Sequence, residues 1–137
     1  MSTDRYTLVI PARPEYLLLA RLALTGVARL AQADEEALAD LRLAVTEAAA
    51  NACRHAYSDG HGDVTIQLTL SDDQQLEVIV EDDGPGFESG SVTEWRAEEL
   101  GEDGMGLAII RAVAEDVEIG PRENGSGTRL RFTRSLR

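Results

Sequence analysis

Three polar residues recur at four-residue intervals near the middle of the chain: Glu47, Asn51 and His55. On a helix this spacing is slightly more than one turn, so the three side chains would lie along one face. Most of the residues between them are alanines, which leave room for a ligand. A carboxylate can accept a proton, and an amide oxygen is a neutral ligand for a hard cation such as Mg²⁺. The segment therefore predicts a polar binding site on a helix.

Each of these residues also has a simpler explanation when it is taken alone. A glutamate on a helix is commonly solvated, and a histidine near a helix end commonly forms a local hydrogen bond. Asn51 is harder to explain in this way, because asparagine disfavours the interior of a helix. We therefore expect Asn51 to bind a ligand, whereas His55 stays open between a ligand and a local hydrogen bond.

A first glycine motif follows a predicted strand and has the sequence Asp83-Gly84-Pro85-Gly86. Its glycines permit positive φ angles and a close approach of the backbone to a ligand, while the proline stiffens the turn. The carboxylate of Asp83 can accept a hydrogen bond from an exocyclic amino group such as that of adenine. An Asp-Gly turn is common in proteins, so this motif carries weight only together with the others.

A second glycine motif, Gly104-Met105-Gly106-Leu107, is predicted to open a helix. The free N–H groups and the positive dipole at such a helix end favour phosphate. Further on, Thr128 follows a glycine-rich turn, where its hydroxyl can face a pocket. The order of these motifs indicates a nucleotide site.

The charge of the chain limits the kind of nucleotide site that is possible. The 137 residues have a formal net charge of −12, and all 13 basic residues are arginine. The acidic balance argues against direct nucleic-acid binding. The absence of lysine excludes a P-loop and the strand lysine of ordinary protein kinases, so an ATP site here needs a different architecture.

Other features of the sequence bear on where the protein acts. No apolar run approaches the length of about 20 residues that a membrane-spanning helix needs, and the N-terminus lacks the layout of a signal peptide. A single cysteine, Cys53, cannot form an internal disulfide. We expect a cytoplasmic protein that does not bind membranes.

Periodicity places these motifs on a small set of elements. Alternating and β-branched runs predict strands, whereas apolar residues at three- and four-residue spacing predict helices. Asp34 is a good N-cap for the helix that carries Glu47. We expect strands at 6–10, 64–70, 76–80, 117–119 and 128–133, helices at 14–31, 35–57 and 104–114, and a long loop at 84–103.

This order predicts an α+β fold, a two-layer sandwich with helices on one face of a mixed, mostly antiparallel sheet. No internal repeat and no linker is evident, so residues 1–137 are expected to form one domain. The loop is long for so small a domain, and such loops are often functional.

The ordered motifs resemble the nucleotide-binding boxes of the GHKL (histidine-kinase-like) ATPase superfamily, whose fold is the Bergerat ATP-binding fold. Within it, the segment from Val45 to Tyr57 and the segment from Gly104 to Ile110 resemble the RsbW-type anti-sigma factor serine/threonine kinases. The resemblance implies a homodimer that sequesters an alternative sigma factor and uses Mg-ATP to phosphorylate an anti-anti-sigma (STAS-type) antagonist.

The resemblance also implies roles for particular residues. Glu47 corresponds to the catalytic base and Asn51 to the Mg²⁺ ligand, which also contacts ATP. Residues 87–103 correspond to an ATP lid. The ATP-binding positions that it implies are Asn51, Asp83, Gly84, Gly86, Gly104, Met105, Gly106, Leu107 and Thr128, with His55 and Arg96 as further candidates.

One departure from the family keeps two functions open. Some members carry a basic residue just before the second glycine motif, where this chain has Glu102 and Asp103. Either another arginine such as Arg96 reaches the terminal phosphate, or the protein is a non-catalytic, ATP-gated module that binds a regulator. A detached histidine-kinase catalytic domain is disfavoured, because no phosphoacceptor-histidine helix precedes the motifs.

Overall fold

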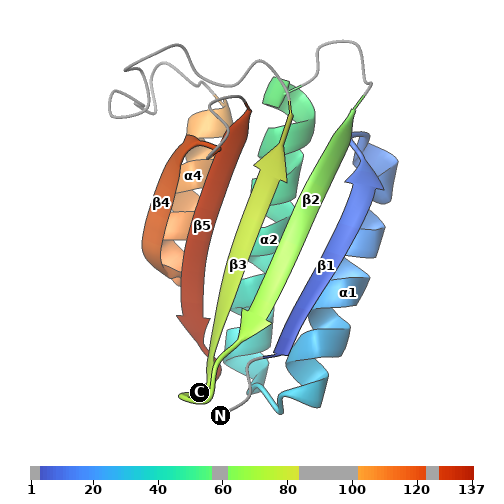
Figure 1. Ribbon diagram of the computed structural model, residues 1–137. Helices are drawn as coiled ribbons and strands as arrows, with labels where there is room; N and C mark the ends of the chain where they lie inside the picture. The colour runs from blue at the N-terminus through green and yellow to red at the C-terminus, as the bar shows by residue number, and fades with distance from the viewer. Residues whose placement is uncertain (1–3, 57–61, 84–101, 123–126) are drawn as a thin grey trace.

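A computed structural model describes residues 4–56, 62–83, 102–122 and 127–137. Three helices cover one face of a five-stranded sheet (Figure 1). The elements in chain order are β1 (Asp4–Pro11), the 3₁₀ turn η1 (Pro14–Tyr16), α1 (Leu17–Leu30), α2 (Glu35–Ala56), β2 (Asp63–Leu70), β3 (Gln75–Asp82), α4 (Glu102–Val113), β4 (Glu115–Pro121) and β5 (Thr128–Ser135). The predicted two-layer α+β sandwich is confirmed.

The strands lie in the order β1-β2-β3-β5-β4, and all four pairings are antiparallel. The predicted hairpin of β2 and β3 is confirmed, with Ile66 opposite Val80. The expected mixed character is not seen among the described strands. The reason is that β4 and β5 form their own antiparallel pair, so β5 runs back alongside β3 in the opposite direction.

The helices begin close to where the sequence predicts. The side chain of Asp34 accepts a hydrogen bond of 2.8 Å from the backbone N–H of Ala37, which is the predicted N-cap of α2. Helix α4 begins at Glu102, two residues before the predicted start. The stretch predicted as one helix from residue 14 is divided, because Pro14–Tyr16 forms a 3₁₀ turn before α1.

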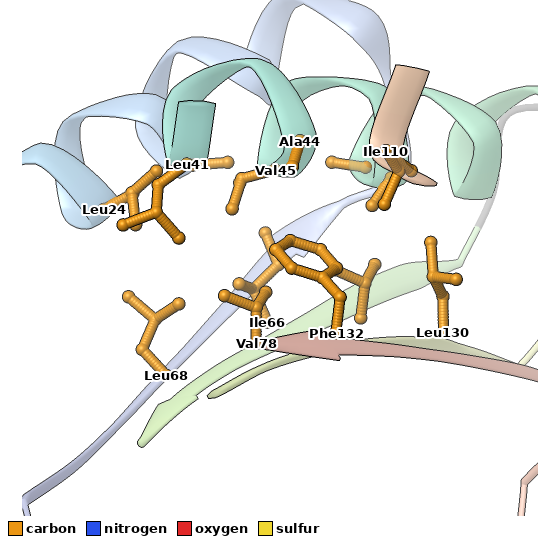
Figure 2. Packing of buried hydrophobic residues seen from close by; sticks show 14 of the residues in the cluster. Leu24, Leu41, Ala44, Val45, Ile66, Leu68, Val78, Ile110, Leu130 and Phe132 are labelled. Carbon is orange, nitrogen blue, oxygen red and sulfur yellow. The ribbon is translucent and has the colours of Figure 1, made fainter. Parts of the chain in front are cut away.

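The core fills the space between the sheet and the helices (Figure 2). Phe132 of β5 and Val78 of β3 lie opposite each other in the sheet and are completely buried. Leu41 and Val45 of α2 and Ile110 of α4 cover them from the helix layer (Figure 2). Helix α2 is the middle helix, since it contacts α1, α4 and the three strands β2, β3 and β5.

An ion pair ties the start of α2 to the end of β5. Nη2 of Arg134 lies 2.9 Å from Oδ2 of Asp40, and the arginine side chain is only 14% exposed. The pair anchors the two elements at the end of the molecule where the last strand finishes (Figure 1).

The packing predicts a large difference between two apolar positions. Phe132→Ala should lower the free energy of unfolding by about 3–5 kcal/mol, because it leaves a cavity under α2 and α4. Leu30→Ala should change it by less than about 0.5 kcal/mol, because Leu30 is 78% exposed. Urea unfolding followed by circular dichroism measures both values, and equal losses would contradict this account of the core.

Candidate functional site

Helix α2 carries both a buried stripe and the candidate polar residues. Leu41, Val45, Ala48 and Ala52 face the core at three- and four-residue spacing. Glu47 and Asn51 lie on the neighbouring face, which is turned toward α4. This edge position keeps their polar ends out of the apolar core while the helix backbone holds them rigidly.

Gly106 of α4 packs directly against these two side chains. A Cβ atom at position 106 would lie 2.8 Å from Oε2 of Glu47 and 3.4 Å from Oδ1 of Asn51. Such a contact is too close for the carboxylate, so any larger residue at position 106 would push Glu47 aside. The structure thus brings together Glu47, Asn51 and Gly106, three of the residues that the sequence singles out.

The amide of Asn51 is buried and only partly satisfied. The residue is 7% exposed, and its Oδ1 accepts a hydrogen bond of 2.8 Å from Nη2 of Arg54. Its Nδ2 has no hydrogen-bond partner within the part of the chain that the structure describes. A buried donor without an acceptor is costly, and such groups are commonly explained by a missing ligand or water.

Two neighbouring acids at the end of β3 have opposite environments. Asp82 is 5% exposed and lies on the helix-covered face, in line with the core residues Val78 and Val80. Asp83 has a side chain that is 66% exposed and forms an ion pair with Arg122. The acid that the sequence analysis selected therefore points outward, and the acid that faces the interior is Asp82.

The two-residue period of a strand could have identified Asp82 from the sequence. Leu76, Val78 and Val80 alternate as the apolar side of β3, and Asp82 is the next residue on that side. The Gly-Pro-Gly motif drew attention to Asp83 instead, because Asp83 directly precedes the first glycine.

Thr128 lies directly opposite Asp82 at the start of β5. Gly127, just before it, has a φ of +76°, and a Cβ atom there would lie 2.0 Å from the carbonyl oxygen of Asp82. Only glycine fits this close backbone approach. Cross-strand neighbours share a face of the sheet, so Thr128 and Asp82 both point toward the helix layer.

Cys53 lies in the last turn of α2. Burial raises the pKa of its thiol, while Arg54 lowers that pKa and the carboxylates of Asp82 and Glu15 raise it further. A thiol with a raised pKa is a poor nucleophile, in line with a packing role for Cys53.

All these residues gather at one end of the sheet. The end of α2, the end of β3, the start of β5 and the start of α4 lie at the upper end in Figure 1. Free N–H groups at the start of α4 make that end favourable for phosphate.

Several predicted site residues lie outside the described residues. They are Gly84, Gly86, Arg96 and the lid segment 87–101; the last two residues of the predicted lid, 102 and 103, begin α4. His55, Gly104 and Met105 have described helical backbones, but their side chains are not described. Leu107 is buried in the core cluster, so its side chain packs in the core.

The arrangement fits a metal-bound nucleotide. The buried amide of Asn51, whose Nδ2 has no partner among the described residues, and the carboxylate of Glu47 both lie against Gly106, near the N-terminus of α4. Asn51 would supply an oxygen ligand to Mg²⁺, which prefers oxygen and keeps several waters. Asp82 offers a buried acceptor at the far side of the same end of the sheet.

Comparison with known families agrees with the geometry. Residues 10–134 match the family described as histidine kinase-like ATPase domain. Serine-protein kinase RsbW from Listeria monocytogenes serotype 4a (strain HCC23) is 38% identical over 125 residues, which cover 85% of this chain and 79% of the relative. Serine-protein kinase RsbW from Bacillus subtilis (strain 168) is 33% identical over 144 residues, covering 98% of this chain and 88% of the relative.

Solved structures share the fold. The RsbU and RsbW domains of a Mycobacterium tuberculosis protein superimpose with a TM-score of 0.72 at 21% identity, covering 96% of this chain and 32% of that one. A blue-light activated histidine kinase from Erythrobacter litoralis superimposes with a TM-score of 0.61 at 26% identity, covering 93% of this chain and 42% of that one.

The contact between Gly106 and Glu47 can be tested by stability measurements. Gly26→Ala in α1 should raise the free energy of unfolding by about 0.5–1 kcal/mol, because alanine is the better helix former and no atom lies within 4 Å of the new Cβ. Gly106→Ala should gain less, because the new methyl displaces Glu47. Urea unfolding measures both changes.

A double substitution supplies the control for this prediction. In a Glu47→Ala background, Gly106→Ala should gain nearly as much as Gly26→Ala, because the clashing carboxylate is gone. The same gain for Gly106→Ala with and without Glu47 would refute the contact.

Proposed function

The chain belongs to the histidine kinase-like ATPase family, with RsbW serine-protein kinases among its relatives, and from this premise we propose that it is an ATP-dependent serine/threonine protein kinase that acts as an anti-sigma factor. Its substrate would be an anti-anti-sigma antagonist. The observation that carries the proposal is the convergence of Glu47 and Asn51 of α2 on Gly106 near the start of α4. A carboxylate, which can accept a proton, and an amide oxygen, which can bind a cation, therefore lie near the N-terminus of α4, and this arrangement supports the proposal.

We propose that Glu47 is the general base. It would accept the proton of a substrate hydroxyl while the hydroxyl oxygen bonds to the γ-phosphorus and the bond to ADP breaks. Glu47 is half-buried on helix α2 and its carboxylate lies against Gly106, near the helix end proposed for the phosphates, which suits this task.

We propose that Asn51 holds Mg²⁺ through its Oδ1. Magnesium bound with ATP supplies charge neutralisation for phosphoryl transfer. The support is the buried amide, which has an orphaned Nδ2 and lies against Gly106. Backbone N–H groups in the first turn of α4, which includes Gly104, would bind the phosphates; at Met105 and Gly106 the N–H groups fall where the hydrogen bonds of the helix itself begin.

For adenine we propose Asp82 in place of Asp83. A buried carboxylate that faces the interior can accept a hydrogen bond from the exocyclic amino group, whereas the side chain of Asp83 points outward to Arg122. Thr128 is its cross-strand neighbour and would line the same part of the pocket. Gly84, Gly86, Arg96, His55 and a lid over residues 87–101 remain predictions from the sequence motifs.

We further propose that the protein acts in the cytoplasm as a homodimer, with an alternative sigma factor and a STAS-type antagonist as partners. No helix in the described ranges has both the length and the apolar character to cross a membrane. The partner assignment rests on the resemblance to RsbW-type kinases rather than on a feature of the surface.

An apolar face of α1 and β1 supports a protein–protein contact. β1 is an edge strand, and a groove between it and α1 is lined by apolar residues. Exposed apolar residues surround it: Tyr6, Leu18, Leu19, Leu22 and Leu30. Residues 1–33 contain four arginines and two acids, whereas the whole chain has 13 basic and 25 acidic residues. Two strongly acidic chains would meet with least repulsion at this face.

A non-catalytic, ATP-gated binding module is the second candidate. The observation that favours it is the pair Glu102 and Asp103, which occupies the place of a basic residue before the glycine motif. Negative charge there disfavours the terminal phosphates. A module of this kind would bind ATP and its regulator but would transfer no phosphate.

Glu47→Gln separates the two candidate functions. In a kinase, phosphate transfer from labelled ATP to an anti-anti-sigma protein should fall by about 100-fold or more, because the base is lost, whereas ATP affinity should change little. Transfer that is unaffected by the substitution would rule out this role for Glu47. No transfer by the wild-type protein, together with normal ATP binding, would favour the binding module.

Asp82→Asn and Asp83→Asn form a matched pair that tests the adenine assignment. Asp82→Asn should weaken ATP binding by about tenfold to hundredfold, because a charge-assisted hydrogen bond is lost. Asp83→Asn should change the affinity by less than about threefold, because the side chain of Asp83 is 66% exposed and points outward to Arg122. Calorimetric titration measures both, with thermal melts to verify folding, and a larger effect at Asp83 would reverse the assignment.

A further inference from the structure

Arg54 donates a hydrogen bond to the side-chain oxygen of Asn51. Its Nη2 lies 2.8 Å from Oδ1 of Asn51, one helical turn earlier on α2. This oxygen is the same atom that the proposed function assigns to the metal. We propose that the guanidinium of Arg54 stands in for the divalent cation in the nucleotide-free protein and must leave Oδ1 when the metal binds.

The orientation of the Asn51 amide supports this proposal. The amide oxygen points to the positive guanidinium, while Nδ2 stays buried without an acceptor in the described part of the chain. Turning the amide over would place its N–H groups against the N–H groups of Arg54, which repel them. The charged hydrogen bond thus holds the amide with its oxygen turned toward Arg54, although burying Nδ2 without an acceptor costs free energy. The oxygen therefore already has the orientation that a cation would need.

Arg54 and a divalent cation are poor neighbours on one oxygen. An amide oxygen has two lone pairs, but a guanidinium and Mg²⁺ both bring positive charge to the same atom at close range. The site is partly shielded from water because Asn51 is 93% buried, so the repulsion is screened less than at an open surface. Metal binding therefore has to displace the arginine.

Two other arginines near this end of the sheet, Arg122 and Arg129, form ion pairs with carboxylates of β3 and the residue after it. Arg122 faces Asp83 and Glu81, and Arg129 faces Glu81. Arg54 donates a hydrogen bond to the neutral amide that is assigned to the metal. Arg54 also lowers the pKa of the neighbouring Cys53 thiol, whereas Asp82 raises it.

This inference rests on the proposed metal role of Asn51, and it predicts a property that the proposed function does not. In the wild-type protein, part of the binding energy of the metal is used to displace Arg54. Removal of Arg54 should therefore increase the gain in nucleotide affinity that Mg²⁺ provides.

The test compares the affinity for a non-hydrolysable ATP analogue, measured by calorimetry, in excess Mg²⁺ and in EDTA. For Arg54→Gln the ratio of the two affinities should rise by about threefold to tenfold over the wild-type ratio. Arg54→Lys should stay close to wild type, because an ammonium group can still donate to Asn51. Arg42→Gln removes an exposed arginine about 18 Å away along the same helix and should leave the ratio unchanged.

The possible results are distinguishable. A ratio for Arg54→Gln that is unchanged or lower would overturn the inference; in particular, equal losses of affinity with and without Mg²⁺ would show that Arg54 instead binds the nucleotide itself. Should Arg54→Gln fail to fold, Arg54→Met provides the same comparison with a similar side-chain stem. Absence of nucleotide binding by the wild-type protein would overturn the proposed function and this inference together.

A second readout needs no nucleotide. In the NMR spectrum of the nucleotide-free protein, the side-chain amide resonances of Asn51 should shift on Arg54→Gln but not on Arg42→Gln. Resonances that stay in place on Arg54→Gln would contradict the hydrogen bond on which the proposal depends.

Discussion

Helix α2 has two structural roles, and both depend on the close packing of its side chains. It must bury an apolar stripe against the sheet, and it must hold a carboxylate and an amide against α4. Alanine is the residue that makes both possible, since the small side chains around Asn51 let α4 approach until Gly106 contacts Glu47 and Asn51. The fold, the polar site and the spacing between α2 and α4 all depend on this close packing.

Charge is the second constraint on the site. A chain with a net charge of −12 and no lysine has to attract an anionic nucleotide by means other than a surplus of cations. The structure has a helix N-terminus at the start of α4 and a buried amide, Asn51, whose oxygen accepts a hydrogen bond from Arg54; in the proposed function this amide binds the metal. Each of these devices acts locally, because a dipole or a single cation matters only within a few ångströms in the presence of salt.

Much of the fold was readable from periodicity and local chemistry. The N-cap at Asp34, the hairpin of β2 and β3, and the identity of every described helix and strand followed from short-range patterns. The boundaries were less accurate: all five described strands are longer than predicted, because pairing with a neighbour extends a strand beyond its apolar run. The division of the first helix at Tyr16 depends on the 3₁₀ turn that Pro14 begins, which the apolar pattern does not reveal.

For the site, the sequence by itself determined which residue types are present and that Glu47 and Asn51 share a helix face. The alternation along β3 also indicates that Asp82 continues the side of Leu76, Val78 and Val80, and the structure shows that the helices cover this side. The tertiary structure alone decided that Gly106, more than 50 residues further along the chain, closes against Glu47 and Asn51, and that Thr128 lies opposite Asp82. The physical reason is that residue spacing fixes the face of its own helix or strand on which a side chain lies. A site forms only where the packing of several elements brings such faces together.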